Sequence, residues 1–160
     1  MRWVPRQAGP SDVDAAIGVW RRANEARGVH HPPEVTDRVL QTLTHPAGVF
    51  VVVEEAGTIV GMAAGEPGRA DRGAGPEVSG LFHLNVVFVD AGHWGQGIGA
   101  VVLDALLAAV RAAGYTRIQL WTGAGNERAR RLYGSRGFAP SGDTDVLDSH
   151  GEILQYARDL

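Results

Sequence analysis

The chain contains no cysteine, so disulfides, thiolate metal sites and a cysteine nucleophile are excluded. It also lacks any run near the roughly 20 apolar residues of a membrane span. Its first residues, Met1 to Arg6, do not carry the apolar core of about 7–15 residues that a signal peptide needs. An excess of positive charge is missing too, since the net charge is -3, and this argues against nucleic acid as a partner. We therefore expect a cytoplasmic protein that binds neither membrane nor nucleic acid.

What the chain does contain is typical of a globular protein, with 44% hydrophobic and 21% charged residues. A chain of 160 residues buries about two-thirds of its unfolded surface. We expect residues 1–160 to form one domain, because no linker, repeat or low-complexity segment interrupts them.

The first half predicts helices followed by a hairpin. Ser11 is a candidate N-cap for a helix that ends at Gly28. Helical spacing of apolar residues predicts a second helix near 34–44. Two β-branched runs, 49–53 and 58–63, flank Gly57 as in an antiparallel hairpin. Residues 66–76 are rich in glycine, proline and charge, which predicts a mobile loop.

The second half alternates strands and helices. The expected elements are a long strand, a nearly all-apolar helix, a strand, a short helix and two final strands, at about 81–89, 98–113, 115–121, 127–135, near 138 and 153–157. This order predicts a mixed α/β sheet rather than a plain repeat of βα units.

A glycine loop opens the apolar helix. Gly95, Gly97 and Gly99 follow a strand and precede the helix, so their backbone approaches an anion closely and presents free N–H groups at a positive helix end. The same pattern also occurs in tight turns without a ligand. Its spacing is neither that of a dinucleotide site nor that of a P-loop.

The short helix places two polar side chains on one face. Asn126 and Tyr133 lie seven residues apart, which is close to two helical turns, and Ala129 between them leaves room for a ligand. The alternative is that Asn126 caps the helix and Tyr133 fills the core.

These two motifs resemble the GCN5-related N-acetyltransferase (GNAT) superfamily. Its loop signature, Gln/Arg-x-x-Gly-x-Gly/Ala, is similar to residues 94–99, except that Trp94 replaces the Gln or Arg. Its second signature is met by Asn126, Ala129, Leu132, Tyr133, Gly137 and Phe138. The resemblance implies an acyl-CoA N-acyltransferase fold, with a mostly antiparallel central sheet, one splayed parallel strand pair and about four helices.

The resemblance also implies that acetyl-CoA is bound. The backbone of Val87, Phe88 and Val89 would pair with the pantetheine arm. Trp94 has no charge to offer, so the pyrophosphate would depend on backbone amides. The remaining cofactor-binding residues that the resemblance implies are Gly95, Gln96, Gly97, Ile98, Gly99, Ala100, Asn126, Ala129 and Tyr133.

The catalytic residues that the resemblance implies must solve two proton problems. Tyr133 stands where the family carries an acid for the departing thiolate. A primary amine near pKa 10 must lose a proton before it attacks, and His83, four residues before Val87, is the candidate base. His83 is equally well explained as a hydrogen-bonded sheet residue. Asn85 and Glu77 are candidate substrate-binding residues, with Glu66 as a further carboxylate.

The acceptor is expected to be the primary amine of a small molecule. Family acceptor sites use the first two helices, here about 11–44, and the late hairpin, here about 140–152, which contains Asp143, Asp145 and Asp148. These aspartates also fit a solvated acidic turn. Transfer onto a peptide or protein, and acyl-CoA binding without catalysis, remain alternatives, as does a homodimer. We expect no metal, because His30, His31 and His45 lack helical ligand spacing.

Overall fold

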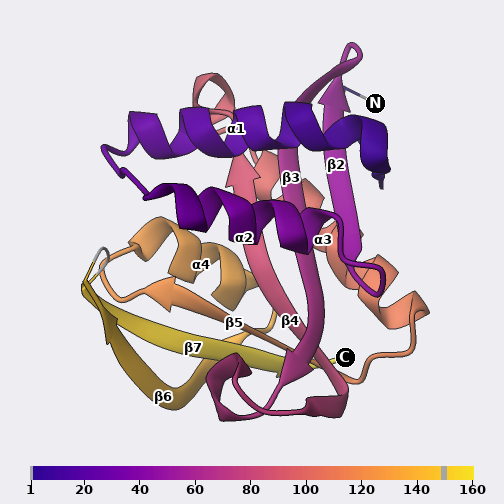
Figure 1. Ribbon diagram of the computed structural model, residues 1–160. Helices are drawn as coiled ribbons and strands as arrows, with labels where there is room; N and C mark the ends of the chain where they lie inside the picture. The colour runs from indigo at the N-terminus through magenta and orange to yellow at the C-terminus, as the bar shows by residue number, and fades with distance from the viewer. Residues whose placement is uncertain (1, 149–150) are drawn as a thin grey trace.

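A computed structural model describes residues 2–148 and 151–160 (Figure 1). Seven strands form one sheet in the order β1-β2-β3-β4-β5-β7-β6. The strands are β1 (Val4–Gln7), β2 (Val49–Glu55), β3 (Thr58–Arg69), β4 (Glu77–Val89), β5 (Arg117–Gly123), β6 (Ala139–Leu147) and β7 (Gly151–Asp159). All neighbouring strands pair antiparallel except β4 and β5. The expected mixed sheet is confirmed.

Helices cover both faces of this sheet. They are α1 (Val13–Ala26), α2 (Pro33–Leu43), α3 (Ile98–Ala112) and α4 (Glu127–Ser135). Helices α1 and α2 lie together over one face, and α3 lies behind it (Figure 1). Tyr133 of α4 joins the core that contains α3. None of the helices in the described part of the chain is long and apolar enough to cross a membrane.

Strands β4 and β5 separate along their length. Their parallel pairing covers Leu81–Leu84 of β4 and 117–120 of β5. Beyond it, β5 continues to pair with β7, while β4 continues to pair with β3. The backbone edge of 87–89 is therefore open on the side of β5. This is the splayed parallel pair expected from the resemblance, and it is confirmed.

A bulge at Asn85 turns β4 at this point. The register to β3 passes from Leu84 opposite Gly65 to Val86 opposite Ala64, so Asn85 is the extra residue. Because of it, Leu84 packs in the core under α3 whereas Val86 packs in the core under α1 and α2. The bulge thus re-aims the strand where it leaves β5.

The loop prediction for 66–76 is wrong at its start. β3 continues through Arg69, and the connection to β4 is 70–76, with a short 3-10 helix over Asp71–Gly73. Pairing with β4 drives this extension, with Pro67 opposite Phe82. Gly68 lies within this extension, and only glycine fits there, because an added Cβ would lie 2.5 Å from Leu81 Cγ of β4.

Ser11 is not the N-cap of α1. A 3-10 helix over Pro10–Asp12 precedes α1, and Asp12 occupies the cap position without a side-chain cap bond. The Asp12 carboxylate instead accepts from Arg6 at 2.8 Å and from Gly9 N at 2.8 Å. The arginine holds the pKa of Asp12 at about 2. The tertiary ion pair overrides the local capping pattern.

Candidate functional site

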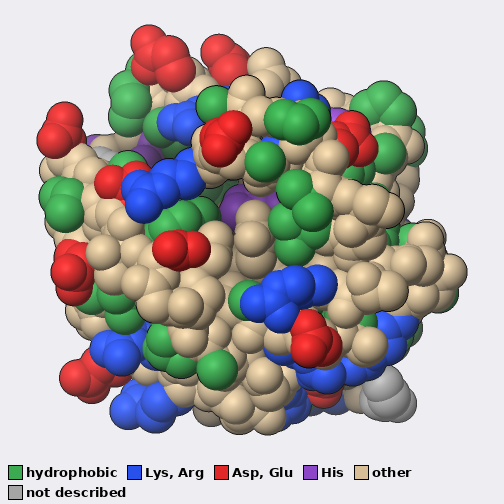
Figure 2. All heavy atoms as spheres, turned by 90° about the horizontal axis from the view of Figure 1, so that it is seen from below, with side chains coloured by type: hydrophobic (Ala, Val, Ile, Leu, Met, Phe, Trp, Pro, Cys, Tyr) green, Lys and Arg blue, Asp and Glu red, His purple; other side chains and the backbone are tan. Residues whose placement is uncertain are grey.

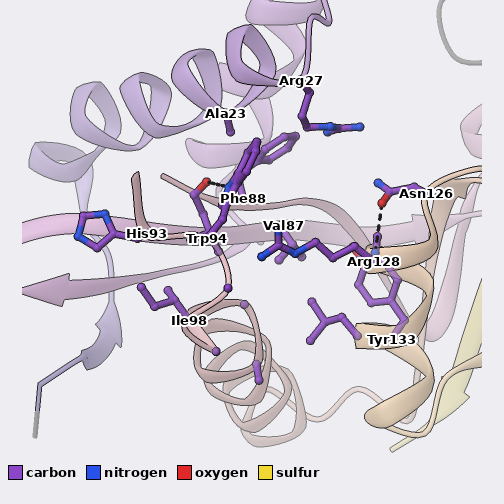
Figure 3. Close-up of a pocket in the computed structure, with 17 residues that line it drawn as sticks. Ala23, Arg27, Val87, Phe88, His93, Trp94, Ile98, Asn126, Arg128 and Tyr133 are labelled. Atoms are coloured by element: carbon purple, nitrogen blue, oxygen red, sulfur yellow. Dashed lines mark hydrogen bonds between the residues drawn. The ribbon is translucent and has the colours of Figure 1, made fainter. Parts of the chain in front are cut away.

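A cavity of about 450 Å³ opens between the free edge of β4 and the starts of α3 and α4. Figure 3 shows that its labelled side chains come from α1, β4, the glycine loop with the turn before it, and α4. The volume lies within the range of ligand pockets. Its lining is Ala23, Arg27, Val87, Phe88, Val89, His93, Trp94, Gly95, Gly97, Ile98, Gly99, Ala100, Asn126, Arg128, Ala129, Leu132 and Tyr133.

The glycine loop leaves a helix start uncapped at this cavity. Gly95 and Gly97 have φ of 79° and 86°, a region that other residues rarely adopt. Gly97 is the N-cap of α3, and no side chain caps this end. The first N–H groups of α3 therefore remain available to an anion, and the helix dipole favours negative charge there.

Along the open edge of β4, the backbone N–H and C=O groups of successive residues point alternately to β3 and to the cavity. Asp90 N donates to Val60 O of β3 at 2.8 Å. By the antiparallel alternation, Phe88 also turns its backbone polar groups to β3, while Val87 and Val89 turn theirs to the open side. The predicted pairing of 87–89 with a ligand thus narrows to Val87 and Val89. The Val89 carbonyl already accepts from Trp94 Nε1 at 2.8 Å.

Asn126 caps α4 and still faces the cavity. Its Oδ1 accepts from Ala129 N at 3.2 Å, so the capping alternative raised from the sequence is correct. The cap uses only the oxygen. The side-chain N–H groups of Asn126 therefore remain available to donate to a ligand. Asn126 can cap α4 and bind a ligand at the same time, so the two interpretations made from the sequence are compatible.

Tyr133 lies at the buried end of the cavity, with 8% of its surface exposed. Its ring packs edge-on against Phe138, 5.8 Å away between centroids. Burial raises the pKa of Tyr133 to about 12, against a smaller opposing effect of the Arg27 charge. The phenol is therefore protonated at neutral pH and can donate a hydrogen bond.

A second cavity, of about 730 Å³, lies along the earlier part of β4. Figure 2 shows a hollowed face with a histidine at the floor and charges of both signs around the rim. The lining is Arg38, His45, Glu66, Pro67, Arg69, Ala70, Asp71, Arg72, Gly73, Glu77, Val78, Leu81, His83, Asn85, Gln119, Trp121, Asp143 and Gln155.

A row of polar side chains crosses the floor of this cavity. Glu66, His83 and Gln119 are opposite one another on β3, β4 and β5. His83 Nδ1 lies 3.4 Å from Gln119 Nε2, and Gln155 Nε2 lies 3.4 Å from Gln119 Oε1. Burial lowers the pKa of His83, so the imidazole is neutral at pH 7. The row thus sets one side of this neutral ring beside the Gln119 amide.

The loop between β3 and β4 is fastened across the cavity by Arg72. Its Nη1 pairs with Asp145 Oδ2 of β6 at 2.8 Å, and its Nη2 donates to Thr144 O at 3.1 Å. The guanidinium also lies 5.6 Å from the ring centroid of Trp121. Asp71 and Arg72 have positive φ, which is strained for residues with a Cβ. These contacts hold a strained turn over the opening.

The cavities separate the two predicted residue sets. Every predicted cofactor-binding residue lines the first cavity except Gln96, which is exposed beside it. His83, Asn85, Glu77 and Glu66 line the second. In the late hairpin, Asp143 lines the second cavity and Asp145 pairs with Arg72, while residues 149 and 150 lie outside the described residues.

Sequence reasoning missed several lining residues. Gln119, Trp121 and Gln155 belong to strands whose register sets them beside His83, and a single sequence does not reveal that register. Arg27, His93 and Arg128 line the first cavity from three different segments. Arg128 lies inside the second signature, and its sequence interpretation was a largely solvated face from which one arginine could meet the cofactor's 3′-phosphate. Among the described residues, no group of three potential metal ligands occurs.

Comparison with known proteins places this geometry in context. The profile of the Acetyltransferase (GNAT) family matches residues 16–138. A mycothiol acetyltransferase of Propionibacterium freudenreichii subsp. shermanii is 33% identical over 139 residues, covering 80% of this chain and 40% of that protein. N-acetyltransferase 8 of Rattus norvegicus is 33% identical over 116 residues, covering 71% of this chain and 50% of that protein. The chain thus spans 40% and 50% of the lengths of these two relatives.

Solved structures share the fold over nearly the whole chain. The ribosomal-protein-alanine N-acetyltransferase of Brucella melitensis superposes with a TM-score of 0.78 at 23% identity, covering 98% of this chain and 99% of that one. A GCN5-related N-acetyltransferase from Kribbella flavida gives 0.77 at 23% identity, covering 99% and 98%. At this identity the similarity shows the fold alone.

The open edge of β4 and the uncapped glycine loop are the two features that the sequence resemblance implied, and the family profile matches the part of the chain that contains both. The chain belongs to the GNAT family of acetyltransferases, as its motifs indicated. This family generally uses acetyl-CoA as its acyl donor.

Proposed function

We propose that this protein is an N-acetyltransferase that transfers the acetyl group of acetyl-CoA to a primary amine of a small molecule. The amine attacks directly while both substrates are bound, and residues 1–160 act as one domain. The observation that carries this proposal is that two cavities share β4, one at 87–89 and the other at 81–85. Donor and acceptor can therefore meet along a single strand.

The first cavity fits a thioester carrier that bears phosphates. The free N–H groups at the start of α3 suit a pyrophosphate, and the Asn126 amide is a further donor. Val87 and Val89 offer strand-like pairing to an amide-containing arm. Bound acetyl-CoA supplies an activated acetyl group and a thiolate leaving group.

Two groups of the chain act on the thioester in this proposal. The Val87 N–H donates to the oxygen on which negative charge develops, which is oxyanion stabilisation. Tyr133 donates a hydrogen bond to the departing sulfur. An ordinary thiol has a pKa near 8.5, so complete proton transfer from a phenol of pKa about 12 is uphill by roughly 3.5 units. Tyr133 therefore stabilises the thiolate without surrendering its proton.

His83 is the proposed base, acting through water. Four residues of strand separate it from Val87, a span of about 13 Å that an imidazole does not bridge alone. To accept a proton at Nε2, the ring must carry its hydrogen on Nδ1. Gln119 turns its Nε2 to the ring and its Oε1 to Gln155 Nε2, so this tautomer requires both amides to exchange the places of their oxygen and nitrogen.

The charges of the second cavity support a small amine as the acceptor. Glu66 and Asp143 line it and attract an ammonium group, and Asn85 donates to Glu66 Oε1 at 3.4 Å. The ion pair between Arg72 and Asp145 joins the loop between β3 and β4 to β6 and so closes one side of the cavity, which favours a small molecule over a folded protein surface. The names of similar proteins do not determine the acceptor, since one is a mycothiol acetyltransferase and another a ribosomal-protein-alanine N-acetyltransferase.

A thiol-release screen tests the proposal. The protein is incubated with acetyl-CoA and a panel of small amines, alongside peptides with free N-termini or lysine. Release of thiol with a small amine, and an acetylated amine by mass spectrometry, supports it. Preference for peptides would establish the protein-acetylating alternative. Tight binding of acetyl-CoA with no transfer to any acceptor would establish a non-catalytic acyl-CoA-binding module.

A further inference from the structure

Trp94 stands where the family signature has Gln or Arg, so this position of the glycine loop offers a phosphate neither a positive charge nor a side-chain amide. The indole has a different use here. Its single donor, Nε1–H, is taken by Val89 O at 2.8 Å. Trp94 thereby ties the loop to β4 and turns a ring face outward. A cationic side chain that reaches the pyrophosphate therefore has to come from another segment of the chain.

Arg128 provides that charge from α4. Its Cζ lies 5.6 Å from the centroid of the Trp94 ring, within cation–π range. A methyl group on Gly95 would lie 3.9 Å from Arg128 Nη2. Figure 3 shows the side chain reaching from α4 toward Trp94 across the cavity. The guanidinium is thus located over the glycine loop and between the two helix starts.

The position of the Arg128 charge does not stabilise α4. It lies in the first turn of α4, where the helix dipole disfavours a cation. No carboxylate among the described residues pairs with it, whereas Arg72 and Arg136 each form an ion pair. An arginine held by a ring face keeps its N–H groups for an anion.

We propose that Arg128 is the cationic ligand of the donor's pyrophosphate, with Trp94 as the platform that positions it. This inference rests on the proposed function, because it concerns the same donor. In this protein the cationic side chain is thus on α4, whereas the family signature can place it in the glycine loop, at the position of Trp94. The other arginines of α4 differ: Arg130 donates to Tyr156 and Ala124, and Arg131 is exposed and absent from the cavity lining.

Calorimetry with three ligands tests this assignment. Coenzyme A carries the pyrophosphate and a 3′-phosphate, dephospho-coenzyme A keeps only the pyrophosphate, and pantetheine has neither. Arg128→Gln should weaken the binding of both coenzymes roughly tenfold, as expected for a charge-assisted hydrogen bond at an exposed site. Pantetheine affinity should not change. Arg131→Gln, on the same helix, is the matched control and should behave as the unaltered protein.

A double-mutant cycle with Trp94→Leu tests the platform. The effect of Arg128→Gln should shrink several-fold in that background, because the guanidinium has already lost its position. Equal losses in both backgrounds would refute the role of Trp94.

The outcomes separate this inference from the proposed function. If the unaltered protein binds no coenzyme A, the proposed function fails. If it binds and Arg128→Gln leaves the affinity unchanged, only the present inference fails. A loss seen with coenzyme A but not with dephospho-coenzyme A would assign Arg128 to the 3′-phosphate and overturn the pyrophosphate assignment.

Discussion

Replacing Tyr133 by phenylalanine isolates the contribution of one buried phenol. The substitution keeps the ring that packs against Phe138 and Tyr156, at 5.8 and 6.4 Å between centroids, and removes only the hydroxyl. The fold should therefore be retained. Since a buried hydroxyl is costly unless it is paired, the stability should change by less than about 1 kcal/mol.

The rate should fall even though the fold is kept. A hydrogen bond to a charged group contributes about 1.5–3 kcal/mol, which corresponds to roughly 10- to 150-fold in rate. We expect kcat to drop within this range, while the dissociation constant of acetyl-CoA changes less than about threefold. The assay is single-turnover acetyl transfer at saturating donor, alongside calorimetric donor binding.

Tyr156→Phe is the matched control for this experiment. Tyr156 is equally buried, at 5% exposure, but its hydroxyl accepts from Arg130 Nε at 3.0 Å and the residue does not line the cavity. Its loss should lower stability by about 0.5–1.5 kcal/mol and leave the rate unchanged. An unaltered rate in Tyr133→Phe would refute the role given to Tyr133. Equal rate losses in both variants would show that the Tyr133 hydroxyl affects the rate only through packing.

Four further predictions concern protonation and the acceptor cavity. His83→Gln should lower kcat/KM at least tenfold; because burial lowers the pKa of His83, the unaltered enzyme should keep its activity as pH falls through 6.5 and lose it only below, and a decline starting above 7 would contradict this. Tyr133 has a folded pKa of about 12 against an unfolded value near 10, so its contribution to stability is complete below pH 10 and is lost toward pH 12. Between pH 9 and pH 11.5, urea titrations should show that the free energy of unfolding falls by about 2 kcal/mol in the unaltered protein but not in Tyr133→Phe. Equal losses in both proteins would disprove the raised pKa of Tyr133. Asp12, with a pKa of about 2, stabilises the fold above its unfolded pKa and less so as pH falls toward 2, and Asp12→Asn should cost about 1–2 kcal/mol at pH 7 after allowance for solvent around Arg6, measured by thermal unfolding. Arg72→Ala should raise the KM of the acceptor several-fold without affecting donor affinity. A change in donor affinity with an unchanged acceptor KM would contradict the assignment of the second cavity to the acceptor.

Local patterns predicted the parts of the site that are built from consecutive residues. The glycine loop and the Asn126–Tyr133 helix are each defined by short-range spacing, and both line the same cavity. The family resemblance joined them, since spacing alone does not show that two segments meet.

Features that depend on long-range pairing were not predictable. The extension of β3 through Arg69 follows from its register with β4. The row from Glu66 to Gln119 needs the order of three strands. Ser11 failed as a cap because Arg6, from β1, holds the neighbouring Asp12. In each case a distant partner outweighed the local preference.

The central claim is that main-chain amides at the start of α3 and the open edge of β4 hold the acyl donor. Amide chemical shifts during titration with acetyl-CoA measure this directly. The account predicts saturable shifts at Gly95–Ala100, Val87 and Val89, with much smaller changes at Gln119 and Gln155. Shifts confined to the second cavity, or none at saturating donor, would contradict it.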